Sequence, residues 1–201
     1  MKKALSIILV SLMFFAVTSV RTFAATTHKV EKGDSLWRIA VKYKVGLSEI
    51  KTANPSIKNY NLIYPGQIIN IPTVSSSVTA FENEVVRLVN EIRISNGLKP
   101  LTQDWQLSRV ARFKSQDMKD LGYFSHSSPT YGSPFEMMKS FGITYRTAGE
   151  NIAKGYATPK AVVEAWMNSP GHRANILNSS YTHIGVGYVA SGNYWTQMFI
   201  G

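Results

Sequence analysis

The apolar pattern that follows residue 25 predicts a small unit in the order strand, helix, helix, strand. A strand-like segment at 27–30 precedes Asp34, whose carboxylate can accept hydrogen bonds from the free amides of a helix that starts there. Apolar residues then recur at helical spacing over 36–43, and a shorter helix fits 48–53 because Asn-Pro follows it. Alternating apolar residues at 68–71 predict the closing strand.

The pattern from residue 80 onward predicts helices followed by an antiparallel pair of strands. Thr79 and Glu82 have the spacing of a capping box ahead of a helix that ends at Asn96-Gly97. Further helices are predicted at about 104–121, 134–140 and 159–168. The buried face of the first of these three is expected to comprise Leu107, Val110, Ala111, Met118 and Leu121. A β-hairpin over 182–200 completes an α+β domain.

The Ser-rich segment 73–79 follows Pro72 and shows no apolar period. Such a segment is typical of a linker. The chain is therefore divided into a module at 26–72 and a larger module at 80–201.

Residues 1–25 have the charge and hydropathy pattern of a secretory signal peptide. Lys2 and Lys3 precede an apolar run over 4–17, and the small residues Ala24 and Ala25 lie where a peptidase would cut. The alternative is an uncleaved membrane anchor, but the run is shorter than the roughly 20 residues that span a bilayer. We therefore expect a secreted protein without a transmembrane anchor once the signal peptide is removed.

The composition excludes several kinds of site and limits the partners that the protein can bind. The 201 residues contain no Cys, which excludes disulfide scaffolds, Cys nucleophiles and thiolate metal sites. With 22 Lys and Arg against 12 Asp and Glu, the net charge is +10. A basic exported chain can meet nucleic acid, an anionic membrane or an anionic cell wall, and export makes nucleic acid the weakest of these partners.

The small module resembles the LysM family over its whole length. The match consists of Val30-x-Lys32-Gly33-Asp34-Ser35-Leu36-Trp37, then Asn54-Pro55, then Ile63-Tyr64-Pro65-Gly66-Gln67. This resemblance implies a βααβ fold that binds peptidoglycan and other glycans containing N-acetylglucosamine in a groove between two loops. In this chain the implied glycan-binding residues are Gly33, Asp34, Ser35, Leu36, Ile63, Tyr64, Pro65 and Gly66. The simpler interpretation of Gly33, Pro65 and Gly66 is turn geometry, and it is compatible with a groove.

The larger module is similar to the CAP superfamily in its bacterial SCP-like branch. The resemblance is carried chiefly by Phe124-Ser125-His126-x-Ser128-Pro129, Gly149-Glu150-Asn151-Ile152-Ala153 and Ser169-Pro170-Gly171-His172-Arg173-x-Asn175. It implies an α-β-α sandwich whose central cleft gathers two histidines and two acidic residues. The matching positions, which are the candidate catalytic residues, are His126, Glu136, Glu150 and His172.

Two imidazoles beside two carboxylates leave three interpretations open. His126 and His172 can bind a divalent metal such as zinc, the four residues can perform acid–base chemistry, or the carboxylates can simply orient the histidines. A further set is assigned structural or solvated roles, namely Glu164, Trp166, Asn175 and His183. The sequence contains no Gly-x-Ser-x-Gly elbow and no His-Glu-x-x-His motif.

Two functions remain for a secreted, cell-wall-associated protein of this kind. The first is a binding or assembly factor of the envelope, with an envelope or spore protein as partner and the spore coat or cortex as a candidate setting. The second is a hydrolase, either a peptidase or a peptidoglycan-remodelling enzyme, which the small module delivers to its substrate.

Overall fold

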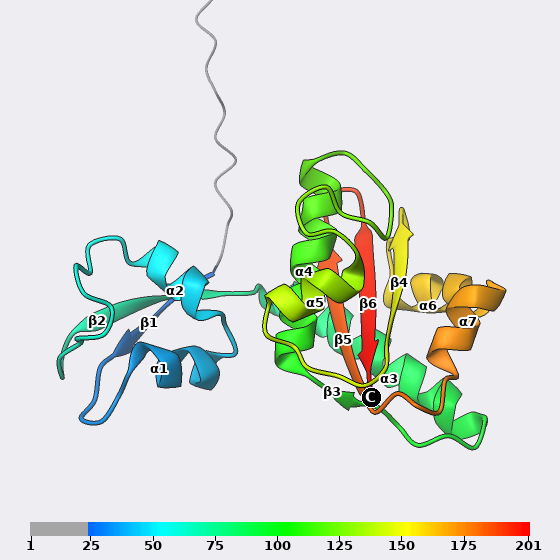
Figure 1. Ribbon diagram of the computed structural model, residues 1–201, viewed down its shortest axis with the longest axis horizontal. Helices are drawn as coiled ribbons and strands as arrows, with labels where there is room; N and C mark the ends of the chain where they lie inside the picture. The colour runs from blue at the N-terminus through cyan, green and yellow to red at the C-terminus, as the bar shows by residue number, and fades with distance from the viewer. Residues whose placement is uncertain (1–23) are drawn as a thin grey trace, which may run out of the picture.

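The computed structural model describes residues 24–201 as two modules that lie side by side (Figure 1). The signal peptide predicted over residues 1–25 lies outside the described residues, except for Ala24 and Ala25 at the start of the first strand. Within the described part, no helix is both long enough and apolar enough to cross a membrane.

The small module confirms the predicted order of elements. Strand β1 (Ala24–Lys29), helices α1 (Leu36–Tyr43) and α2 (Leu47–Ala53) and strand β2 (Ile68–Thr73) follow one another, and β1 pairs antiparallel with β2. The two helices cover the sheet over a core of Val30, Leu36, Ile39, Ala40, Val45, Ile50, Ile69 and Ile71.

The cap of α1 differs from the prediction. Ser35, and not Asp34, is the N-cap, because the Ser35 hydroxyl accepts a hydrogen bond from the amide of Arg38 at 3.2 Å. The carboxylate of Asp34 is turned back toward β1, where it lies 2.8 Å from both the Glu31 amide nitrogen and His28 Nε2.

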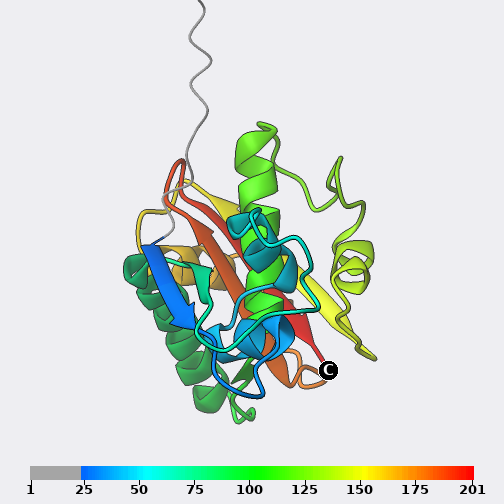
Figure 2. The same cartoon turned by 90° about the vertical axis from the view of Figure 1, so that its left-hand side faces the viewer.

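The larger module is a three-layered α-β-α sandwich, which confirms the α+β class. Its elements are α3 (Ser76–Ser95), β3 (Thr102–Gln103), α4 (Trp105–Asp120), α5 (Pro134–Ser140), β4 (Ala148–Lys154), α6 (Pro159–Met167), α7 (Pro170–Ile176), β5 (His183–Val189) and β6 (Tyr194–Ile200). The strands are ordered β3-β5-β6-β4, and β5 and β6 form the predicted hairpin. Helices α4 and α5 cover one face of the sheet, while α3 and α6 cover the other (Figures 1 and 2).

The structure differs from the sequence analysis at three places. Strand β2 continues to Thr73 and α3 begins at Ser76 with Ser75 as its N-cap, so only Val74 and Ser75 separate the modules instead of a linker over 73–79. Leu121 is 55% exposed because α4 ends before it. Helix α7 was not predicted, although Pro170 stands at its first turn, where proline is favourable.

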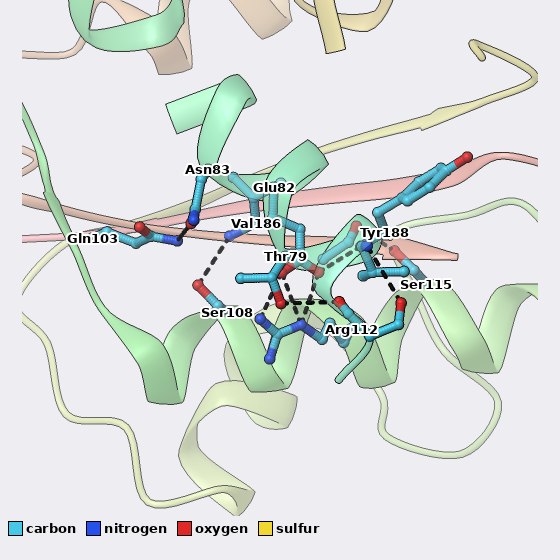
Figure 3. Close-up of polar contacts among 12 residues, drawn as sticks. Thr79, Glu82, Asn83, Gln103, Ser108, Arg112, Ser115, Val186 and Tyr188 are labelled. Carbon is cyan, nitrogen blue, oxygen red and sulfur yellow. Dashed lines mark hydrogen bonds and ion pairs between the residues drawn. The ribbon is translucent and has the colours of Figure 1, made fainter. Parts of the chain in front are cut away.

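The predicted capping box at Thr79 and Glu82 is wrong as well, because Glu82 is fully buried within α3. Its carboxylate accepts hydrogen bonds from Nε and Nη2 of Arg112 on α4, at 2.7 and 2.5 Å, and from the backbone amide of Tyr188 on β5 at 3.1 Å (Figure 3). Burial raises the pKa of Glu82, while the hydrogen bonds and charge of Arg112 oppose this rise. One buried ion pair thus joins helices on opposite faces to the strand between them.

We expect Arg112→Met to lower the free energy of unfolding by about 3–5 kcal/mol, because it leaves the Glu82 carboxylate buried without its partner. The double variant Glu82→Met/Arg112→Met should recover much of this loss. The matched control is Arg87→Met, which removes two exposed ion pairs within α3 and should lower the free energy of unfolding much less. Urea unfolding of the four proteins measures these differences, and equal losses for Arg112→Met and Arg87→Met would contradict the assignment.

Candidate functional site

The structure brings together His126 and Glu150, two of the four predicted site residues. Glu150 lies on β4, the edge strand of the sheet, and His126 lies in the loop that follows α4. Nδ1 of His126 and Oε1 of Glu150 are 2.7 Å apart, with 52% of the imidazole but only 1% of the carboxylate side chain exposed. A buried carboxylate therefore orients an imidazole at the surface.

The charge of this pair depends on its surroundings. Burial raises the pKa of Glu150, and the hydrogen bond to His126 together with the charge of Lys114 opposes the rise. The second carboxylate oxygen, Oε2, is buried and has no hydrogen-bond partner among the described residues. His126 Nε2 likewise makes no hydrogen bond within the described part, so this nitrogen is available to a ligand.

The loop that carries His126 is fixed to α4 by two residues that the sequence analysis missed. The ammonium of Lys114, which is fully buried, donates to the His126 carbonyl at 2.9 Å and to the Tyr123 hydroxyl at 3.0 Å. Asp117, one turn further along, accepts hydrogen bonds from the hydroxyls of Tyr123, Ser128 and Thr130. The sequence does contain a signal that Lys114 is buried, because this residue stands four residues from both Val110 and Met118, within the apolar stripe of the helix.

His172 lies on α7, beside the same edge strand. Its carbonyl accepts a hydrogen bond from Asn151 Nδ2 at 3.1 Å, and Asn151 points from β4 to the face opposite Glu150. Burial lowers the pKa of His172, and the charge of His126 lowers it further. Hydrogen bonds thus place His126 beside Glu150 and attach α7 to β4 through the His172 carbonyl, and the convergence of the His172 side chain on the pair stays a prediction.

Glu136 has other partners. Its carboxylate accepts hydrogen bonds from the amide and hydroxyl of Ser133, both at 2.7 Å, and so completes a capping box at the start of α5. This bonding lowers the pKa of Glu136. No hydrogen bond or ion pair among the described residues joins Glu136 to the other three, and the convergence of all four stays a prediction.

The donor set fits a metal poorly. Zinc sites take three or four protein ligands. In the part of the chain that the structure describes, no three His, Asp or Glu side chains are grouped to hold a metal ion. His126 Nδ1 is already engaged by Glu150. The arrangement supports an oriented imidazole for binding or proton transfer.

Strand β4 lies at an edge of the sheet, and side chains donate hydrogen bonds to the carbonyls on its outer side. Hydroxyl, amide and indole donors lie 3.1–3.2 Å from three of its carbonyls: Tyr181 to Ala148, Asn175 to Glu150, and Trp166 to Ile152. These contacts cover an edge that would otherwise be open to pairing. The predicted core role of Trp166 and the bracing role of Asn175 are consistent with them.

Gly149 is required by the same arrangement, since a Cβ there would lie 2.4 Å from the Tyr181 hydroxyl. Two other predicted non-site residues behave as expected. Glu164 is exposed next to Lys160, and His183 contacts the Thr182 hydroxyl at the start of β5.

The implied glycan-binding residues occupy two loops at the end of the small module that points away from the larger one (Figure 1). Gly33 and Gly66 have φ of 93° and 90°, so turn geometry explains both glycines. Leu36 is buried in the core, whereas Tyr64 is 60% exposed. The sequence analysis missed two exposed apolar side chains of this module, Trp37 at 64% and Leu62 at 51%.

Family comparisons define the class of protein. The family model described as the cysteine-rich secretory protein family, or CAP, matches residues 86–199, and the LysM domain model matches residues 28–72. The chain therefore belongs to the CAP family and carries a LysM domain. This combination of domains fits an extracellular, cell-wall-associated protein.

Among individual proteins, the chain is similar to uncharacterized protein YkwD of Bacillus subtilis, with 69% identity over 126 residues that cover 63% of this chain and 49% of that protein. It also resembles the crystal structure of an extracellular protein containing an SCP domain from Bacillus anthracis, with a TM-score of 0.60, 35% identity, and coverage of 68% and 47%. N-acetylmuramoyl-L-alanine amidase sle1 of Staphylococcus epidermidis is 33% identical over 88 residues, which cover 44% of this chain and 26% of that protein. The chain spans about half the length, or less, of these proteins.

We expect His172 to titrate below the ordinary histidine value of about 6.5. Because its pKa is lowered in the folded protein, the unfolded chain binds more protons below that pH, and the free energy of unfolding falls on acidification. NMR titration of the imidazole tests the first statement. Urea unfolding at pH 7.5 and 5.5, compared with His172→Gln, tests the second. A His172 pKa at or above 6.5 would contradict both.

Proposed function

We propose that the LysM domain holds this protein to the cell wall and that the CAP domain acts there as a binding or assembly factor of the envelope. The observation that carries the proposal for the CAP domain is the His126–Glu150 pair, in which a buried carboxylate orients a half-exposed imidazole. The free Nε2 can hydrogen-bond to a polar group of a ligand. We expect the ligand to be either a non-protein component of the cell envelope or a protein of the envelope or spore.

The wall-binding half of the proposal rests on the two loops at the far end of the LysM domain. Tyr64 offers an exposed aromatic face, and the face of a sugar ring packs well against such a ring. The positive charge of the chain adds a salt-dependent attraction to an anionic wall. Secretion, and a spore coat or cortex setting, belong to the same proposal.

A hydrolase is the second candidate, and the same pair of residues favours it. A carboxylate that orients an imidazole is the arrangement by which a general base is held in the correct tautomer. The similarity to an N-acetylmuramoyl-L-alanine amidase suggests peptidoglycan as the substrate. However, no Ser hydroxyl of the described part is bonded to His126 Nε2, so such an enzyme would have to activate water.

Wall binding is tested by sedimenting the protein with purified peptidoglycan sacculi. We expect Tyr64→Ala to weaken binding about tenfold in moderate salt, because an aromatic side chain that becomes buried contributes about 1.5–3 kcal/mol. Tyr156→Ala, which removes an exposed aromatic from the CAP domain, is the control and should bind normally. Wild-type protein that stays in the supernatant at low salt would rule out the wall-binding role.

Turnover separates the two candidates. We expect the purified protein to release no more muropeptides from sacculi, and to cleave no more surface protein, than His126→Ala does. Activity in the wild-type protein that is lost in His126→Ala would establish the hydrolase instead. Circular dichroism of both proteins would show that the substitution at this half-exposed position leaves the fold intact.

A further inference from the structure

The two modules are joined by a polar contact between residues that are far apart in the sequence. Arg109 on α4 donates through Nε to one carboxylate oxygen of Glu49 on α2, and through Nη2 to the other at 2.7 Å. Nη2 also lies 3.1 Å from the Ser48 hydroxyl. The side chains of Arg109 and Glu49 are 18% and 23% exposed, so this two-pronged pair is partly shielded from water.

The CAP side of the contact is shaped to hold the guanidinium in place. The Cζ atom of Arg109 lies 5.3 Å from the ring centroid of Phe113 and 5.0 Å from that of Phe141, both within the range of cation–π attraction. Two aromatic rings and one carboxylate therefore surround the same group. This arrangement restricts the rotamers of a side chain that would be flexible on an open surface.

On the LysM side of the contact, Gly46, the N-cap of α2, leaves room for the Arg109 guanidinium. Gly46 has an ordinary φ of −76°, which any residue can adopt, so turn geometry does not explain the glycine. A Cβ at this position would lie 2.4 Å from Cζ of Arg109 and 2.0 Å from a carboxylate oxygen of Glu49. A side chain at this position would therefore have to displace the guanidinium or the carboxylate from their contact.

The chain between the modules is short. Strand β2 ends at Thr73 and α3 begins at Ser76, and the Ser75 hydroxyl caps that helix. Beside the contact lies a cavity of about 430 Å³, lined by Val45 and Val74 on one side and by Phe113 and Tyr188 on the other. Because this gap separates the apolar surfaces, the polar contact at Arg109 is expected to determine the orientation.

We propose that Arg109, Phe113 and Phe141 form a docking surface for the first turn of α2 in the LysM domain, so that the two domains hold one fixed orientation. The loops that carry the implied glycan-binding residues point away from this surface, and docking leaves them accessible (Figure 1). Docking is intramolecular and goes beyond the proposed function, since it does not depend on whether the LysM domain binds glycan.

The chain contains no cysteine, so two introduced cysteines can carry spin labels without interference. Lys58→Cys and Lys99→Cys place exposed labels in the two domains. Double electron–electron resonance on this labelled protein should give one narrow distance peak. Glu49→Arg, which sets two cations against each other, and Gly46→Val, which occupies the space of the guanidinium, should each cause loss of that peak in favour of a broad distribution.

Two further variants sharpen the test. Glu49→Arg combined with Arg109→Glu restores opposite charges and should give a narrower distribution than either single variant. Glu164→Arg changes an exposed ion pair on α6 and should leave the narrow peak unchanged. Circular dichroism would show that every variant is folded.

Docking would be overturned by a broad distribution in the labelled parent protein. It would also be overturned if Glu49→Arg and Gly46→Val both kept the narrow peak, or if the charge exchange gave no narrowing. Sedimentation with sacculi is measured on the same variants, and the expected binding equals that of the parent. A protein that docks but does not bind sacculi would contradict the proposed function and leave docking intact.

Discussion

Helix α4 lies directly on strand β5 because Gly185 and Gly187 put no side chain between them. A Cβ on Gly185 would lie 2.3 Å from the Leu107 carbonyl carbon, and one on Gly187 would lie 2.1 Å from the Arg112 amide nitrogen. This close approach fixes the helix against the sheet. Its first turns then face the LysM domain, its middle holds the buried carboxylate of α3, and its last turns face the loop that carries His126.

Polar groups are buried throughout this arrangement, and the structure stabilises nearly all of them by direct partners. Burial keeps the ammonium of Lys114 away from water, which lowers its pKa. The ammonium still donates two hydrogen bonds, and the charge of Glu150 nearby opposes the fall in pKa. Two polar atoms of the described part, Glu150 Oε2 and Gln197 Nε2, are buried without a partner. Unpaired buried groups are costly, and Glu150 belongs to the pair that presents an open imidazole nitrogen.

Local signals in the sequence predicted the order of elements in the LysM domain, the hairpin over 182–200 and the short helix at 134–140, since turns and apolar periods determine each within a few residues. The same local rules misassigned Glu82, because a Ser/Thr-x-x-Glu pattern is identical whether the carboxylate caps a helix or pairs with a distant arginine. His126 and Glu150 were placed in one cleft through the family resemblance. Gly46 and Asp117 were missed because their partners are set by tertiary packing, whereas the apolar spacing around Lys114 already indicated that this residue is buried.

Helix α4 also connects the domain contact to the candidate site. Arg109 and Asp117 are eight residues apart on this helix, which is about 12 Å along its axis at 1.5 Å per residue. A helix of this length that is packed against a sheet moves as one body, so an orientation fixed at Arg109 is carried to the loop that Lys114 and Asp117 hold. A chain attached to the wall through its LysM loops would therefore present His126 in a defined direction, whereas a flexible tether would leave that direction unspecified.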